Sequence, residues 1–240
     1  MIYTGTAGWA ISKELKSYFP PEGTHLERYA RTFKTVEINS SFYRTHMPKT
    51  YARWSESVPE NFLFSLKLFR EFTHVLRLKV PPSALEEAVA PLLQFKKYAV
   101  LLVQLPPSLA FDFETAESFF EGLRQIYLGP VAVEPRHPTW CSSDSRELFA
   151  DFKLTKVQAD PELCPCEFEG TGLVDYIRLH GTPEIYASNY SDDFLLRLSQ
   201  GLNPKRPTFV IFDNTMYGHA TRNAFAFQSL VRPSELQAFR

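Results

Sequence analysis

Eight short apolar runs, each followed by turn residues and then by a segment with helical spacing, make up most of this sequence of 240 residues. Successive runs lie roughly 20 to 40 residues apart, which is the length of a strand, a crossover helix and two loops. The alternation therefore predicts parallel strands that are joined by helices. The predicted strands are residues 2–5, 35–39, 63–68, 99–105, 131–134, 154–158, 176–180 and 208–213.

Helix start and stop signals lie between these runs. Thr24 and Ser83 each precede a Glu by three residues, which is the capping box that satisfies the first free N–H groups of a helix. A third helix is predicted after Asp112, and Gly129 with the proline after it ends this helix. Pro91 predicts a kink or a break in the helix that begins at Ser83. Weaker helical spacing covers residues 48–58, 146–152, 194–202 and 221–230.

Eight strands alternating with about eight helices are the pattern of a (β/α)₈ barrel of the TIM type, whose typical length is about 250 residues. An open doubly wound sheet is the main alternative, but no Gly-x-Gly-x-x-Gly motif follows the first run. We therefore expect an α/β fold with a TIM-type barrel in which some helices are irregular or missing. No linker divides the chain, so we expect a single barrel domain over residues 1–240, with 231–240 as a peripheral C-terminal tail.

Polar side chains gather where the predicted strands end. The outward face of a barrel strand packs on helices, where an unpaired charge is costly, so these polar side chains must point into the barrel. Their convergence at the C-terminal mouth predicts a functional site, because barrel enzymes keep their active sites there. A buried ion pair is the alternative interpretation of any one of them. The polar positions are Glu37, Asn39, Ser65, Lys67, Gln104, Glu134, Arg136, Tyr176, Arg178, His180, Asp213 and Asn214.

Two carboxylates on well separated strands, Glu37 and Glu134, are the predicted catalytic pair for general acid and base chemistry. His180 is predicted to carry protons near neutral pH as a third catalytic residue. Three cations suit a phosphate or carboxylate group of the substrate: Lys67, Arg136 and Arg178. The other expected substrate contacts are Trp9, Asn39, Tyr43, Gln104, His137, Asp213 and Asn214, of which the two aromatic rings suit the face of a sugar or a nucleobase. A histidine bonded to the neighbouring backbone is the alternative for His137 and for His180.

A metal centre is a further alternative at the same mouth. If a metal is bound, its ligands are Glu37, Glu134, His180 and Asp213, which suit Mn²⁺, Mg²⁺ or Zn²⁺. No HxH or HExxH spacing supports this set, and the neighbouring cations compete with a metal ion. We therefore expect no metal, and the sequence requires no cofactor.

Three cysteines form an odd set, so they do not predict a disulfide framework. Cys164 and Cys166 are separated by one residue, which is the wrong spacing for a CxxC knuckle, and no second pair is present. We therefore expect ordinary loop thiols rather than half of a metal site.

Charge and hydropathy limit the partners. Lys and Arg number 26 against 27 Asp and Glu, and the formal net charge of -1 offers no global basic field for extended nucleic acid or an anionic membrane. No window approaches the roughly 18 apolar residues that a membrane span needs, and the N-terminus lacks a signal-peptide pattern. The expectations are a cytoplasmic location and a small anionic molecule as partner, with no oligomeric state specified.

Seven motifs, in chain order, closely resemble the YecE-like family, also called domain of unknown function 72. They are TGTAGW at 4–9, EINSSFYR at 37–44, FSLK at 64–67, LVQLPP at 102–107, EPRHPTW at 134–140, RLHG at 178–181 and FDNT at 212–215. The resemblance covers about residues 1 to 230 and implies a (β/α)₈ barrel, but no established activity. The sequence departs from the family pattern at Pro135, where an aromatic or aliphatic residue is usual, and at Asp213, where Asn is common.

These observations together predict an enzyme of the hydrolase or lyase type. Its substrate would be small and anionic, phosphorylated or sugar-containing, and bound at the C-terminal mouth of the barrel. Two alternatives stay open: a non-catalytic module that binds a nucleotide or nucleic acid, and a hydrolase that depends on a divalent metal.

Overall fold

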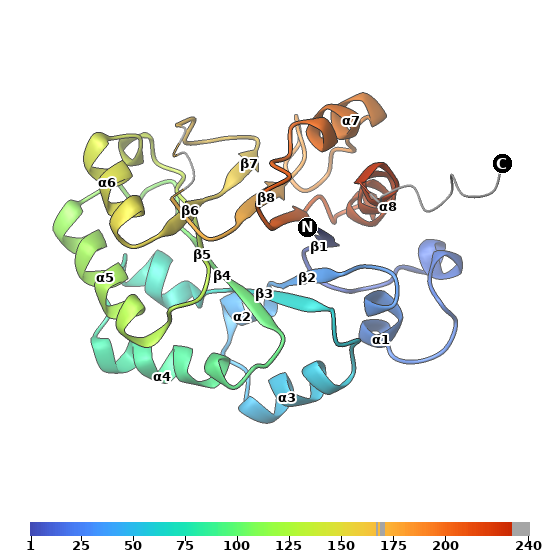
Figure 1. Ribbon diagram of the computed structural model, residues 1–240, viewed down its shortest axis with the longest axis horizontal. Helices are drawn as coiled ribbons and strands as arrows, with labels where there is room; N and C mark the ends of the chain where they lie inside the picture. The colour runs from blue at the N-terminus through green and yellow to red at the C-terminus, as the bar shows by residue number, and fades with distance from the viewer. Residues whose placement is uncertain (167, 169–170, 232–240) are drawn as a thin grey trace.

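The computed structural model describes residues 1–166, 168 and 171–231, and its strands form a ring with helices outside it (Figure 1). One sheet has the order β2-β3-β4-β5-β6 and the other the order β1-β9-β8-β7, and the strand pairs within both are parallel. The strands are β1 (Ile2–Thr6), β2 (Thr35–Ile38), β3 (Leu63–Lys67), β4 (Tyr98–Gln104), β5 (Val131–Glu134), β6 (Leu154–Lys156), β7 (Gln158–Asp160), β8 (Asp175–Leu179) and β9 (Thr208–Phe212).

Two seams close these sheets into one barrel. At the first, β6 and β7 are separated only by Val157, and the pair forms one interrupted strand that joins β5 on one side to β8 on the other. At the second, Ala7 and Glu37 form a parallel bridge between β1 and β2, and the N–H of Gly8 donates to the carbonyl of Glu37 at 2.9 Å. With β6 and β7 taken as one strand, the predicted TIM-type fold is confirmed.

The helices cover the outside of the barrel. They are α1 (His25–Ala30), α2 (Ser40–Tyr43), α3 (Pro48–Glu56), α4 (Pro82–Leu93), α5 (Phe113–Ile126), α6 (Ser143–Asp151), α7 (Asp192–Gln200) and α8 (His219–Val231), with short helical turns η1 (Lys13–Tyr18), η2 (Glu71–Val75) and η3 (Pro138–Trp140). Between β7 and β8, the described residues contain no helix. The expectation of missing helices is therefore confirmed at this connection.

The two predicted capping boxes have different outcomes. Thr24 accepts from the N–H of Glu27, whose carboxylate accepts from the N–H of Thr24, so this box is confirmed. The predicted box at Ser83 is wrong. Helix α4 begins at Pro82, so Ser83 lies inside the helix, and no side chain caps its N-terminus. A proline fits the first turn of a helix, since its φ is already helical and it has no N–H that needs a partner. Pro91 lies inside α4 without ending it, and the helix continues to Leu93.

Two apolar clusters fill the molecule on either side of the strands. The larger lies between strands and helices, and the smaller fills the interior of the barrel with side chains that include Leu102, Tyr176 and Ile211. On β8 the faces alternate, because Ile177 belongs to the outer cluster while Tyr176 belongs to the inner one. The polar strand ends therefore lie at the mouth of the barrel, above the inner apolar cluster.

Two further expectations concern segments outside the barrel core. Among the helices described, none is long and apolar enough to cross a membrane. The C-terminal tail was expected to begin at 231, but residues 232–240 lie outside the described part of the chain.

Candidate functional site

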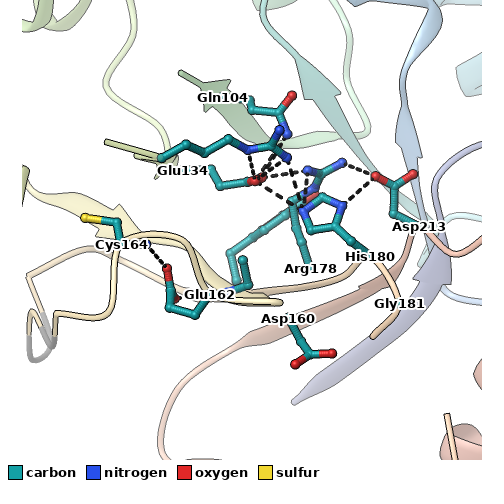
Figure 2. Close-up of polar contacts among 12 residues, drawn as sticks. Gln104, Glu134, Asp160, Glu162, Cys164, Arg178, His180, Gly181 and Asp213 are labelled. Carbon is teal, nitrogen blue, oxygen red and sulfur yellow. Dashed lines mark hydrogen bonds and ion pairs between the residues drawn. The ribbon is translucent and has the colours of Figure 1, made fainter. Parts of the chain in front are cut away.

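Arg178, on β8, lies at the centre of the polar mouth and is fully buried. Its guanidinium donates to both carboxylate oxygens of Glu37, at 3.0 and 2.7 Å. It also donates to Glu134 at 2.6 Å and to Asp213 at 2.9 Å. One cation thus joins three carboxylates that come from β2, from β5 and from the residue after β9. Figure 2 shows the contacts of Arg178 with Glu134 and Asp213.

His180 follows β8 and lies between two of these carboxylates. Its Nδ1 is 3.0 Å from Oδ2 of Asp213, and its Nε2 is 3.1 Å from Oε1 of Glu134. Burial by itself lowers the pKa of His180, but the hydrogen bonds to Asp213 and Glu134 outweigh it and raise the pKa. The two carboxylates favour the imidazolium, in which both ring nitrogens donate, whereas the guanidinium groups of Arg178 and Arg136, 3.3 and 3.4 Å from Nε2, oppose it.

Glu134 is surrounded by donors. Besides Arg178 and His180, its oxygens accept from Arg136, at 2.8 Å from Nε and 2.7 Å from Nη2, and from Nε2 of Gln104 at 3.2 Å. Burial raises the pKa of Glu134, but Arg178, His180 and Arg136 outweigh burial and hold the pKa well below its usual value. Glu134 is therefore ionised at neutral pH and has little capacity to take a proton.

Asp213 has the same electrostatic character. Burial raises the pKa of its carboxyl, but Arg178 and His180 reverse this effect and lower it. We refer to Glu37, Glu134, Asp213, Arg136, Arg178 and His180 as the mouth network. It brings together the predicted catalytic residues and two of the three predicted anion-binding cations.

Glu37 lies at the bottom of the mouth network and has no exposed surface. In addition to Arg178, the hydroxyl of Tyr176 donates to Glu37 at 2.9 Å, and Ser65 bonds to Tyr176 at 2.7 Å. This burial argues against direct contact of a substrate with Glu37, the predicted catalytic carboxylate, and equally with Arg178, a predicted anion-binding cation. Glu37 and Arg178 form hydrogen bonds to each other and to neighbouring side chains within the barrel.

A cavity of about 260 Å³ opens beside the exposed edge of the mouth network. Glu134, Arg136 and His180 line it, together with Glu162 and Tyr186 from the loops after β7 and β8. Tyr186 presents its ring edge-on to His180, with ring centroids 5.8 Å apart, and has a left-handed backbone with φ of 67°. A bulky residue held in this conformation costs about 1 to 3 kcal/mol and is commonest at functional sites.

A larger cavity, of about 810 Å³, lies along the β7–β8 connection, where other connections carry a helix. None of the residues predicted from the strand ends to form the site lines this cavity. We therefore place the candidate site at the smaller one, where the ionisable groups converge.

Lys67, at the end of β3, is a buried cation that is only 8% exposed. Within the described residues its ammonium makes no hydrogen bond or ion pair, and it lies 4.0 Å from the centre of the Phe42 ring. Burial and the repulsion of Arg178 lower the pKa of Lys67 to about 8, although the nearby carboxylates oppose this shift. Lys67 thus faces the mouth network without a direct counter-ion.

Several other predicted contacts have mainly structural partners. Asn214 donates to the carbonyl of Ser188 and to the side chain of Asn223, which ties the end of β9 to α8. His137 accepts from the N–H of Thr139 and so caps η3, as the alternative interpretation expected.

The remaining predicted contacts lie towards the β1 and β2 ends of the mouth. Trp9 packs edge-on against Trp54 at 5.1 Å between ring centroids, whereas Tyr43 is 73% exposed. Oδ1 of Asn39 is buried and lacks a partner within the described residues. These three residues do not line the cavity beside His180, so their part in binding stays a prediction.

The four predicted metal ligands surround Arg178 rather than an open centre. The guanidinium contacts Glu37, Glu134 and Asp213 directly, at distances between 2.6 and 3.0 Å. A metal ion at this position would have to displace a fully buried cation.

Glu162 lines the cavity, but the strand pattern did not predict it, because it lies in a loop where period-two alternation carries no information.

Comparison with known proteins identifies relatives by sequence. A family model described as "Protein of unknown function DUF72" matches residues 3–238. The UPF0759 protein YunF of Bacillus subtilis (strain 168) is 29% identical over 152 residues, which cover 59% of this chain and 53% of that protein. The matched part thus spans about half the length of this curated relative.

Two solved structures resemble the whole barrel. A DUF72 family protein from Enterococcus faecalis V583 superposes with a TM-score of 0.80 and 21% identity, over 98% of this chain and 96% of that one. A DUF72 family protein from Thermotoga maritima MSB8 has a TM-score of 0.76 and 25% identity, over 96% of this chain and 99% of that one. The barrel is therefore shared across low sequence identity.

Proposed function

This chain belongs to the DUF72 family, and we propose that its barrel mouth performs acid–base chemistry on a small anionic substrate. The observation that carries the proposal is the position of His180. Its ring lies in the cavity wall, with each nitrogen within hydrogen-bond distance of a carboxylate that Arg178 holds in place. Such an imidazole is oriented before any substrate arrives.

His180 is the proton-transferring group of this proposal. Glu134 shares the cavity wall, but its cationic donors keep it ionised, so it orients the imidazole rather than accepting a proton. The raised pKa favours the protonated form of His180, so in this proposal it acts first as a general acid. Glu37 and Arg178, which lie deeper, act as positioning residues because they hold Glu134 and Asp213 against the ring.

The charge of the site supports an anionic substrate. The three carboxylates of the mouth network balance its two arginines and the protonated His180. Lys67 then remains as a positive charge that no carboxylate of the described part of the chain contacts directly. A buried ammonium gains a strong partner when an anion binds, so we infer that a phosphate or carboxylate group of the substrate docks on Lys67.

Calorimetric titration with inorganic phosphate at pH 7 tests the anion site. We expect the wild type to bind phosphate and Lys67→Met, which keeps the length of the side chain, to lose at least about tenfold in affinity, a change of about 1.4 kcal/mol. The matched control is Lys34→Met, which removes the same charge from an exposed position. Equal phosphate affinity in Lys67→Met and wild type would overturn the anion site.

Proton transfer is tested by incubating the protein in D₂O with aldose phosphates, ketose phosphates and 2-hydroxycarboxylates, followed by ¹H NMR. We expect the wild type to convert or exchange at least one compound, and folded His180→Gln to lose this activity. Phosphate binding without conversion or exchange of any compound would overturn the enzyme and favour the non-catalytic nucleotide-binding alternative.

A further inference from the structure

The three cysteines of the chain meet at one point, although they come from two separate segments. Cys141 follows η3, and its Sγ lies 3.0 Å from Sγ of Cys164 in the β7–β8 connection. Sγ of Cys166 lies 3.6 Å from Sγ of Cys164, and the three sulfur atoms all lie within 4.8 Å of one another. We propose that Cys141, Cys164 and Cys166 form a tri-thiolate site for a soft divalent metal ion of the zinc class.

One of the two printed sulfur–sulfur distances fits tetrahedral zinc, whereas Cys141 and Cys164, at 3.0 Å, would have to move apart to bind the same ion. Thiolates that bind zinc tetrahedrally at about 2.3 Å lie about 3.8 Å apart, which is close to the distance between Cys164 and Cys166. A disulfide would use two of the sulfur atoms and leave the third unexplained, whereas one ion uses all three. Thiolate ligands select soft ions such as Zn²⁺ and Cd²⁺ over Mg²⁺ and Ca²⁺.

The surroundings set the coordination and the charge of the site. Among the described residues, no histidine or carboxylate completes the cysteine cluster. Because Cys141 is exposed, water could supply the fourth ligand of a tetrahedral ion. Each thiol gives up a proton when the ion binds, which leaves the complex with one negative charge. The ammonium of Lys156 interacts electrostatically with Cys166, although it is also paired with Glu162 at 3.1 Å.

The proposed site fastens the segment that closes the candidate cavity. The β7–β8 connection has no helix in its described part, yet it supplies Glu162 and Leu163 to the cavity wall. The N–H of Cys164 donates to Glu162 at 3.1 Å (Figure 2). An ion held by Cys141 on one side and by Cys164 and Cys166 on the other would anchor this wall to the turn after β5.

The test uses the full chain, reduced and freed of metal, and titrated with Cd²⁺ under argon. We expect one Cd²⁺ per chain, a thiolate-to-metal absorption band in the near ultraviolet, and a rise in Tm. Cys141→Ser and Cys166→Ser, both at sites that are not fully buried, should lose the band and bind at least about tenfold more weakly. Asp151→Asn is the matched control, because it alters an exposed carboxylate outside the cysteine cluster and should keep both the band and the stoichiometry.

Circular dichroism of the two serine variants establishes that they fold. The absence of a stoichiometric band in the reduced wild type would overturn the proposal, as would an undiminished band in folded Cys141→Ser. A Cys141–Cys164 disulfide found by mass spectrometry, together with failure of the reduced protein to bind Cd²⁺, would replace the metal site with a redox pair. Phosphate binding at Lys67 is measured separately, so the two proposals succeed or fail independently.

Discussion

At the scale of single residues, Arg178 organises the candidate site. It is fully buried and contacts three carboxylates. The energetic cost of burying its charge is offset only if all three carboxylates stay in place. Removal of one partner leaves an uncompensated buried charge, which is usually more harmful than loss of the contact itself. The residues nearest Arg178 therefore serve stability as well as chemistry.

Glu37→Gln tests this dual role. Because the substitution removes the bidentate partner of a buried guanidinium, we expect it to lower the free energy of unfolding by about 3 to 5 kcal/mol. Urea unfolding at pH 7 measures the change. Glu60→Gln is the control, since Glu60 is fully exposed and its pair with Lys97 is 3.5 Å long. A loss no larger than that of the control would contradict the central position of Arg178.

The titration of His180 gives a second prediction at this scale. Because its pKa is raised on folding, its contribution to stability is complete below the unfolded value of about 6.5 and is lost as the pH rises through the folded value. Asp213 has a lowered pKa, so its contribution is present above its unfolded value of about 3.9 and is lost as the pH falls through the folded value.

NMR titration of the imidazole checks this prediction. The wild-type midpoint should lie above about 6.5, and Asp213→Asn should shift it downwards because the charged acceptor at Nδ1 is lost. The exposed Asp151→Asn variant should leave the midpoint of His180 in place. An unchanged midpoint in Asp213→Asn would mean that Asp213 does not hold the charge on the ring.

At the scale of elements, the boundaries of the helices follow from local chemistry. Thr24 caps α1 reciprocally with Glu27, whereas α4 starts on a proline and leaves Ser83 exposed with no capping bond. The same sequence pattern therefore has two outcomes, because a capping box forms only when its first residue stands just outside the helix.

Thr24→Ala and Ser83→Ala form a matched pair that measures this difference. Loss of the cap at Thr24 should lower the free energy of unfolding by about 1 kcal/mol. The same substitution at Ser83 should cause no loss, because alanine is a better helix former at an exposed position. Equal losses in urea unfolding would contradict the assigned start of α4.

At the scale of the whole molecule, the barrel depends on the seam between β1 and β2. The two strands meet through one bridge, and Gly5 lies against the backbone of Thr35 at this seam. A Cβ on Gly5 would lie well inside contact distance of the Thr35 carbonyl oxygen. The close approach of the two strands therefore requires a residue without a side chain.

Gly5→Ala should lower the Tm by at least about 10 °C or prevent folding, since the seam must open to admit a methyl group; for a chain of this length 1 kcal/mol corresponds to about 2 to 4 °C. Gly122→Ala in α5 is the counterpart. There the new Cβ meets Leu85 at 3.7 Å, an ordinary contact, and alanine should raise stability by about 0.5 to 1 kcal/mol. Comparable Tm values for the two variants would contradict closure through Gly5.

The predictions that succeeded depend on local periodicity. The spacing of apolar runs gave all eight strand positions, and the period-two alternation placed Glu37, Lys67 and Arg178 on inward faces. Backbone geometry alone sets these properties, since successive side chains of a strand point to opposite sides. The fold class and the convergence of these charged strand ends at the mouth were therefore predictable, whereas the role of the mouth as a functional site stays a prediction.

The sequence by itself determined an eight-stranded barrel with charged strand ends that point inward. Only the tertiary structure decided which of those ends meet: Arg178 pairs with Glu37 across 141 positions of the chain, and Cys141 reaches Cys164 across 23. Local periodicity sets the direction of a side chain, but closure of the barrel and the paths of its loops set the partner it reaches. Lys67 lies at a strand end like the paired cations, but among the residues that the structure describes it has no direct counter-ion, for the same reason.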